Sequence, residues 1–108
     1  MKPAVLHDDA IAEYRTALDY YSQLRVGLDG EFRKEFENAL ARIRDNPALY
    51  AINDGGVRFC PLHRFPYSLV YADLDDRIWV AAVSHQRRRP RYWSRRRPGD
   101  SGSRQTGN

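Results

Sequence analysis

The spacing of apolar residues changes its period at the turn-forming stretch Asn53-Asp54-Gly55-Gly56. Before this stretch, apolar residues recur every three or four positions, which is the period of an amphipathic helix. After it, short apolar segments are separated by turn signals, and the two-residue period of a strand puts Tyr67, Leu69 and Tyr71 on one face. A chain that changes once, from the helical to the strand period, is expected to pack a helical layer on one face of a sheet.

Two helices are predicted in the first half of the chain. The first runs from Asp8 to about Leu24, and Asp8 and Asp9 suit its start as a cap and as negative charge at the positive end of the helix dipole. Its apolar stripe consists of Ile11, Tyr14, Leu18 and Tyr21. The second runs from about 29 to 46 and ends before Pro47, because a residue before proline is disfavoured in the helical region. A short glycine turn between the two helices makes a helical hairpin.

Three strands are predicted in the second half, at residues 57–62, 67–73 and 77–84. The last two are separated by so few residues that they must be antiparallel neighbours. A short strand at residues 4–7 is restricted to a sheet edge or to a start near Pro3, because proline has no N–H to donate. The predicted fold class is therefore α+β, with an N-terminal helical hairpin packed on one face of a small, mainly antiparallel sheet.

The length of the chain fits one domain. With 108 residues, we expect a single domain at residues 1–97 and a disordered tail at residues 98–108, which contain no apolar residue to anchor them. No apolar run approaches the roughly 20 residues needed to cross a membrane, and the N-terminus has no signal-peptide core. We therefore expect a cytoplasmic protein without a membrane partner. Cys60 is the only cysteine, which excludes an intramolecular disulfide and a multi-cysteine zinc site.

Charge is divided unevenly along the chain. Residues 1–54 hold seven basic and ten acidic side chains, whereas residues 55–108 hold eleven arginines and four aspartates. Seven of these arginines lie between positions 87 and 97, with Tyr92 and Trp93 among them. Arginine binds phosphate and carboxylate groups through paired hydrogen bonds and stacks on planar rings. Such a positive surface indicates nucleic acid or an acidic protein as the partner.

A series of short motifs follows the predicted hairpin in a fixed order: "RFPYSLVY", an acidic turn, "IWVAAVSH" and "RRRPRYWSRR". Their marked residues are Phe65, Pro66, Tyr67, Val83, His85, Arg88, Pro90, Tyr92 and Trp93. Together with the upstream "ALDYYSQLRVGLDGEF", this order resembles the RelE/ParE family of type II toxin–antitoxin toxins. The resemblance covers roughly residues 4–97.

The resemblance implies a small bacterial growth inhibitor that is neutralised by a cognate antitoxin encoded beside it. One branch of the family inhibits DNA gyrase, and another binds the ribosome and cuts mRNA without a metal. The fold alone does not choose between these targets. The antitoxin is expected to lay a helix or an extended acidic segment over the sheet and the hairpin groove. No cofactor and no metal are expected.

The ribonuclease branch carries lysines and an arginine on the first two meander strands, and an arginine and a tyrosine near the C-terminus. By resemblance these positions fall here at Phe59, Pro61, Ser68, Gln86 and Tyr92, and only Tyr92 keeps its type. This departure favours a gyrase-directed or otherwise non-hydrolytic toxin. The alternatives are a ribosome-dependent mRNA endoribonuclease and, from another class, a small nucleic-acid-binding module without toxicity.

The candidate site residues come mainly from the same C-terminal segment. If the chain is an enzyme, we expect His85, Arg88 and Tyr92 to be catalytic, because histidine transfers protons near neutral pH and arginine holds phosphate. His85 has a structural alternative, which is to hydrogen-bond the backbone at the end of the sheet. Trp93 is expected to pack in the core, and Arg95 to Arg97 to add only charge. The expected target-binding residues are Arg58, Arg64, Arg87, Arg89 and Arg91.

Overall fold

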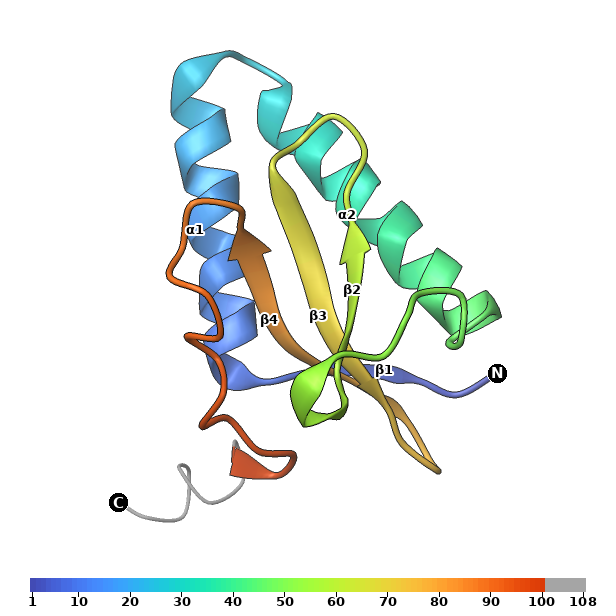
Figure 1. Ribbon diagram of the computed structural model, residues 1–108. Coiled ribbons are helices and arrows are strands. Elements are labelled where there is room, and N and C mark those ends of the chain that lie inside the picture. The colour runs from blue at the N-terminus through green and yellow to red at the C-terminus, as the bar shows by residue number, and fades with distance from the viewer. Residues whose placement is uncertain (101–108) are drawn as a thin grey trace.

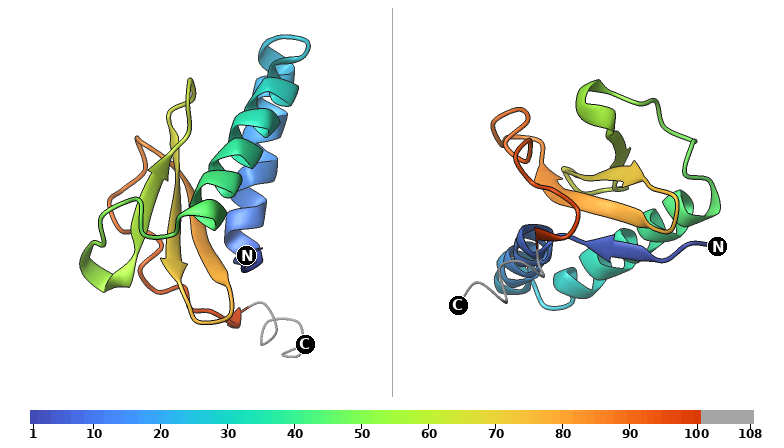
Figure 2. Two further views of the ribbon diagram at one scale, coloured as in Figure 1. Left: turned by 90° about the vertical axis from the view of Figure 1, so that its right-hand side faces the viewer. Right: turned by 90° about the horizontal axis from the view of Figure 1, so that it is seen from below.

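The computed structural model describes residues 1–100, and it confirms the predicted α+β architecture. Two helices pack against a four-stranded sheet, as can be followed in Figure 1, and Figure 2 shows that both helices cover the same face. The elements are β1 (Ala4–Leu6), α1 (Asp8–Leu24), α2 (Leu28–Asp45), a short 3₁₀ turn (Asp54–Gly56), β2 (Arg58–Pro61), β3 (Tyr67–Asp73) and β4 (Ile78–His85).

The sheet has the strand order β1-β4-β3-β2. Strands β2, β3 and β4 form an antiparallel meander, as their short connections predict, whereas β1 pairs with β4 in parallel. The first strand lies at an edge, where the missing N–H of Pro3 leaves no ladder bond unmade. The carbonyl of Pro3 still accepts a hydrogen bond of 2.8 Å from the backbone N–H of Ile78.

The start of α1 differs from the prediction, because the N-cap residue is His7 and not Asp8. The backbone N–H of Asp9 donates to His7 Nδ1 over 3.0 Å. Because α1 follows β1 directly, the cap position falls on the residue that comes after the strand. Asp8 and Asp9 remain in the first turn, where their negative charges interact favourably with the positive end of the helix dipole. The second helix begins after Gly27, whose φ of 88° is a conformation that glycine adopts without strain.

The two faces of the sheet bury different sets of residues. On the helix side, Tyr67, Leu69 and Tyr71 of β3 pack with the aromatic residues of both helices, as the alternation predicts. The main rings of this cluster are Tyr14, Tyr21, Phe32, Phe36 and Phe65. On the opposite side, which we call the open face, a second buried cluster consists of Val57, Val70, Trp79, Ala81 and Ala82.

A β-bulge in β4 changes which face its residues occupy. Val70 pairs with Ala82 while the next residue, Tyr71, pairs with Val80, so Ala81 is the extra residue. As a result Ala81 and Ala82 both pack in the open-face cluster, although they are neighbours along the strand. Val83 then returns to the helix side. The bulge therefore sets the direction in which the end of β4 presents its side chains.

The C-terminal segment lies against the open face. Tyr92 and Trp93 are half-buried and pack on the cluster there, so Trp93 joins a core as predicted. Of the expected tail, residues 101–108 lie outside the described part, and Asp100 contacts His7. Within residues 1–100, no helix is long and apolar enough to cross a membrane.

We expect Tyr71→Phe to lower the free energy of unfolding by about 1–2 kcal/mol. Tyr71 is fully buried, and its hydroxyl donates a hydrogen bond of 2.7 Å to the carbonyl of Pro47. Removal of the donor leaves that carbonyl without this partner. Urea unfolding measures the change, and Tyr20→Phe, at an exposed position, is the control. Equal transition midpoints for the two variants would contradict the assignment.

Candidate functional site

The segment after β4 turns sharply at the end of the strand and runs back along it (Figure 1). The backbone N–H of Gln86 donates to the carbonyl of Pro66 over 2.9 Å, and the N–H of Arg88 donates to the carbonyl of His85 over 3.0 Å. The N–H of Arg87 donates to His85 Nδ1 over 3.0 Å. His85 therefore stabilises this turn by hydrogen-bonding the backbone, which was its predicted structural alternative.

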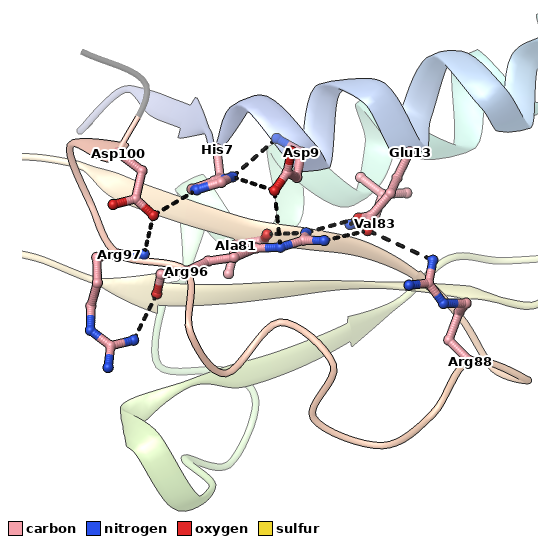
Figure 3. Close-up of polar contacts among 9 residues, drawn as sticks. All are labelled: His7, Asp9, Glu13, Ala81, Val83, Arg88, Arg96, Arg97 and Asp100. Atoms are coloured by element: carbon pink, nitrogen blue, oxygen red, sulfur yellow. Dashed lines mark hydrogen bonds and ion pairs between the residues drawn. The ribbon is translucent and has the colours of Figure 1, made fainter. Parts of the chain in front are cut away.

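Glu13 of α1 anchors the segment to the fold (Figure 3). Its carboxylate accepts hydrogen bonds of 2.8 and 3.2 Å from the guanidinium of Arg96, and both side chains are only 14% exposed. Arg96 also donates to the carbonyl of Ala81 over 2.9 Å and lies 3.8 Å from Asp9. Burial disfavours the charge of Arg96, but the hydrogen bonds and charge of Glu13 outweigh burial and raise the pKa of the Arg96 guanidinium. The expectation that Arg96 adds only charge is therefore wrong.

The same anchor covers the free edge of β4. Strand β1 pairs with β4 only as far as Val80, so the backbone groups beyond it have no neighbouring strand on that side. The N–H of Val83 instead donates to Glu13 over 2.9 Å, and the carbonyl of Ala81 accepts from Arg96. Side chains thus satisfy polar groups that would otherwise make an exposed strand edge.

A second contact joins the two ends of the described chain. His7 is 3% exposed, and its Nε2 lies 2.9 Å from a carboxylate oxygen of Asp100. Because His7 Nδ1 accepts the N–H of Asp9, Nε2 must carry the proton and donate to Asp100. The same carboxylate oxygen accepts the backbone N–H of Arg97 over 2.8 Å. The arginine-rich segment is therefore held at its far end as well as at Arg96.

Tyr92 lies beneath two arginines. The guanidinium carbon of Arg88 is 3.8 Å from the centre of the Tyr92 ring, and that of Arg96 is 5.1 Å away. Burial, with the negative charge of Glu13, raises the pKa of Tyr92 to about 12. Its buried hydroxyl lies near Ser84 and Glu13, but it forms no hydrogen bond of good geometry among residues 1–100. Tyr92 is therefore a neutral phenol at physiological pH and acts as a packing surface for Arg88.

The structure brings His85 and Arg88 to one hollow. This hollow, of about 300 Å³, lies between α1 and the end of β4, and it is lined by Ala12, Glu13, Thr16, Tyr67, Val83, His85 and Arg88. Tyr67 meets His85 edge to face at 5.0 Å, and Arg88, which is 52% exposed, lies 4.0 Å from Glu13. The third candidate, Tyr92, is in contact with Arg88 but does not line the hollow.

The five predicted target-binding arginines divide between three places. Arg87, Arg89 and Arg91 are exposed on the C-terminal segment next to Arg88. Arg58 instead donates to the carbonyl of Tyr50 over 2.6 Å and holds the loop that follows α2. Arg64 pairs with Glu31 of α2 at 2.6 Å, in the connection between β2 and β3. Only the first three share a surface with Arg88.

We expect Tyr92→Phe to leave the free energy of unfolding unchanged or to raise it by up to about 1 kcal/mol, because it removes a buried hydroxyl that forms no hydrogen bond of good geometry. Growth inhibition should also persist, since the ring under Arg88 is kept. Urea unfolding and growth after induction measure the two effects, with Tyr71→Phe as the matched tyrosine that should be destabilised. Loss of toxicity in a stable Tyr92→Phe variant would instead assign the hydroxyl a catalytic role.

Stability should decline in alkaline solution. Burial is the main cause that raises the pKa of Tyr21, Tyr71 and Tyr92 from 10.0 to about 12. Between these values the folded chain keeps phenol protons that the unfolded chain has lost, so the stabilisation is complete below pH 10 and is lost as the pH rises toward 12. Urea unfolding at about pH 9 and about pH 11 should show the decrease. A constant transition midpoint would contradict it.

A family model described as "ParE toxin of type II toxin-antitoxin system, parDE" matches residues 4–90. The chain belongs to the ParE toxin family. It is the toxin component of a type II toxin–antitoxin module, which implies an antitoxin as partner. Among solved structures, a chain of the chromosomal ParDE TA system from P. aeruginosa has a TM-score of 0.64 and 17% identity, and the match covers 79% of this chain and 96% of that chain. That similarity bears on the fold alone. A comparison with curated proteins finds no match.

The anchor residues of this ParE-family toxin were not identified from its sequence. Glu13 lies beside the apolar stripe of α1 and looks like any solvated helix glutamate, and Arg96 is one of seven arginines in its segment. The family match ends at residue 90, before Arg96 and Asp100. Nothing in the local sequence pattern distinguishes the arginine that is paired, so only the three-dimensional fold identifies Arg96 as the partner of Glu13.

Proposed function

We propose that this ParE-family toxin inhibits growth by binding DNA gyrase in the cytoplasm without cutting a covalent bond. We further propose that its contact surface is the arginine face, defined as Arg87, Arg88, Arg89 and Arg91. The observation that carries the proposal is that the acid–base groups around Arg88 are engaged in holding the fold, while the arginines remain exposed.

Each candidate for proton transfer at this site either has a structural hydrogen-bond or ion-pair partner or has a pKa unsuited to proton transfer near neutral pH. Glu13 forms a close ion pair with Arg96, and His85 Nδ1 accepts a backbone hydrogen bond. The pKa of Tyr92, raised to about 12, is far from the neutral range in which a general acid or base is effective. This arrangement supports binding over phosphodiester cleavage.

The arginine face has little internal compensation for its charge. Among residues 1–100, Arg87 and Arg89 form no ion pair, and the separations of Arg88 from Glu13 and of Arg91 from Asp54 are 4.0 and 3.9 Å. Exposed pairs at such distances contribute little, so the positive field extends into solvent. An acidic surface of the target protein would complement this positive charge. We expect the antitoxin to neutralise the toxin by covering the same arginines with acidic residues.

The target is tested by adding purified toxin to a gyrase supercoiling reaction and by following RNA in cells after brief induction. We expect inhibition of supercoiling or trapped cleaved plasmid, with intact mRNA, and reversal by the cognate antitoxin. A prompt stop in translation with cut mRNA, together with normal gyrase activity, would overturn the proposal in favour of the endoribonuclease.

A further inference from the structure

Three adjoining hollows form a trough along the open face. Figure 2 shows the two segments that border much of it, the C-terminal segment and the loop that precedes β2. The volumes of the hollows are about 520, 540 and 300 Å³. Arg91 and Trp93 line all three, so the hollows meet at this pair of residues. The trough lies on the face that the helices leave uncovered, and at one end it shares His85 and Arg88 with the hollow beside α1.

Aromatic side chains line the trough. Trp93 lies in its centre, 5.4 Å from the ring of Phe59 in an edge-to-face arrangement, and Trp79 lines one end. Trp79 and Trp93 are the only tryptophans of the chain, and both line the same hollow. Trp79 is only 7% exposed and forms the floor, whereas Trp93 is half-buried and offers a planar surface on which other planar groups stack.

Cations border the same trough. Arg97 lines one end, Arg88 and Arg89 line the other, and Arg91 lies between them. The Arg91 side chain is 59% exposed and approaches the carboxylate of Asp54, itself 95% exposed, no closer than 3.9 Å. The backbone of Arg91 has a φ of 61°, a left-handed conformation that is uncommon for a residue other than glycine, asparagine or aspartate. Arginine thus occupies a position whose backbone conformation it does not favour.

We propose that this trough binds a short single-stranded nucleic acid, whose bases stack on Trp93 while its phosphates meet Arg91 and the arginines at either end. A positive groove with aromatic platforms is the arrangement that binds single strands without sequence preference. An acidic peptide satisfies the arginines but has no planar group for Trp93. A duplex keeps its bases stacked on each other and away from that ring. This binding goes beyond the proposed action on gyrase and does not depend on it.

The test uses the purified full chain with labelled oligonucleotides of about 12 nucleotides, oligo-dT and oligo-rU, and follows both anisotropy and tryptophan fluorescence. We expect saturable binding with quenching, because both tryptophans line the trough. A stronger response to one oligonucleotide assigns the natural strand as DNA or RNA. Absence of binding to both at low salt would overturn the proposal, as would equal binding of a duplex or of poly-glutamate.

Two matched substitutions separate the trough from general positive charge. Arg91→Asn removes the central cation and suits the left-handed backbone, so the fold should persist. Arg95→Asn removes the same charge from the same segment, at a residue that lines none of the three hollows. We expect Arg91→Asn to weaken binding about tenfold and to make the dependence of log affinity on log salt shallower by about 0.7. Arg95→Asn should change affinity less than about twofold. Equal losses would show that only diffuse charge is involved and would overturn the assignment.

A third variant tests stacking. Trp93→Leu should weaken binding between about fivefold and a hundredfold and reduce the quenching. Circular dichroism checks that the variant is folded, and if it is not, quenching of the intact chain still reports on the trough. Because the measurement uses no gyrase, a toxin that failed to inhibit gyrase but bound oligonucleotides would refute the proposed function and leave this inference standing.

Discussion

Glu13→Ala is expected to lower the free energy of unfolding by about 3 kcal/mol, because it removes one partner of a largely buried ion pair. Arg96 would then keep its charge at 14% exposure with Asp9, at 3.8 Å, as its nearest remaining acid. The N–H of Val83 would also lose its acceptor. Thermal and urea unfolding of the variant measure the loss.

Two comparisons make the result specific to the anchor. Glu37→Ala, on the exposed surface of α2, should change stability by less than about 0.5 kcal/mol. The double variant Glu13→Ala/Arg96→Met leaves neither charge of this pair buried without its partner. Its loss of unfolding free energy should therefore be smaller than the sum of the losses in the two single variants. If Glu13→Ala behaved like Glu37→Ala, the anchor would have no role in stability.

Arg88→Ala is expected to abolish growth inhibition and to weaken binding to gyrase about 30-fold or more, as at a dominant interface residue. Arg88 is the member of the arginine face whose guanidinium is oriented by a second group, since it lies 3.8 Å over the Tyr92 ring. A side chain already held in place loses less entropy on binding. Growth after induction and gyrase inhibition by purified protein measure the effect.

Arg88→Lys refines this expectation. It keeps the charge but loses the planar group that stacks on Tyr92, so inhibition should be intermediate. Arg33→Ala, an exposed arginine on α2, should inhibit gyrase like the unchanged chain. Full toxicity in a folded Arg88→Ala variant would remove Arg88 from the contact surface.

Local pattern predicts most of this fold. The expected second helix at 29–46 occurs at Leu28–Asp45, and the expected last strand at 77–84 occurs at Ile78–His85. These boundaries follow from Pro47, from glycine at the helical turn and from the acidic turn before the last strand, which are all local signals. The bulge at Ala81 has no such signal, because no glycine marks it and because it depends on the register with β3. The cap at His7 was missed since aspartate is the commoner cap.

The candidate site was less predictable than the fold. The assignment of the contact surface to the segment around Arg88 stays a prediction, and the turn at His85 matches its structural alternative. The partners that organise the segment lie far away in the sequence: Glu13 for Arg96, and His7 for Asp100. Periodicity describes one element at a time, so it cannot pair one arginine of seven with one glutamate of a distant helix.

These distant contacts also bear on how the protein is made. Glu13 and Arg96 are separated by 83 positions, and His7 and Asp100 by 93. A ribosome that has released only the helical hairpin has produced neither the strand that β1 joins nor the arginines that Glu13 and Asp9 meet. Contacts of such long range form late in folding. The positive surface of the toxin therefore forms only after residues 87–97 have been synthesised, well after the helical hairpin has emerged.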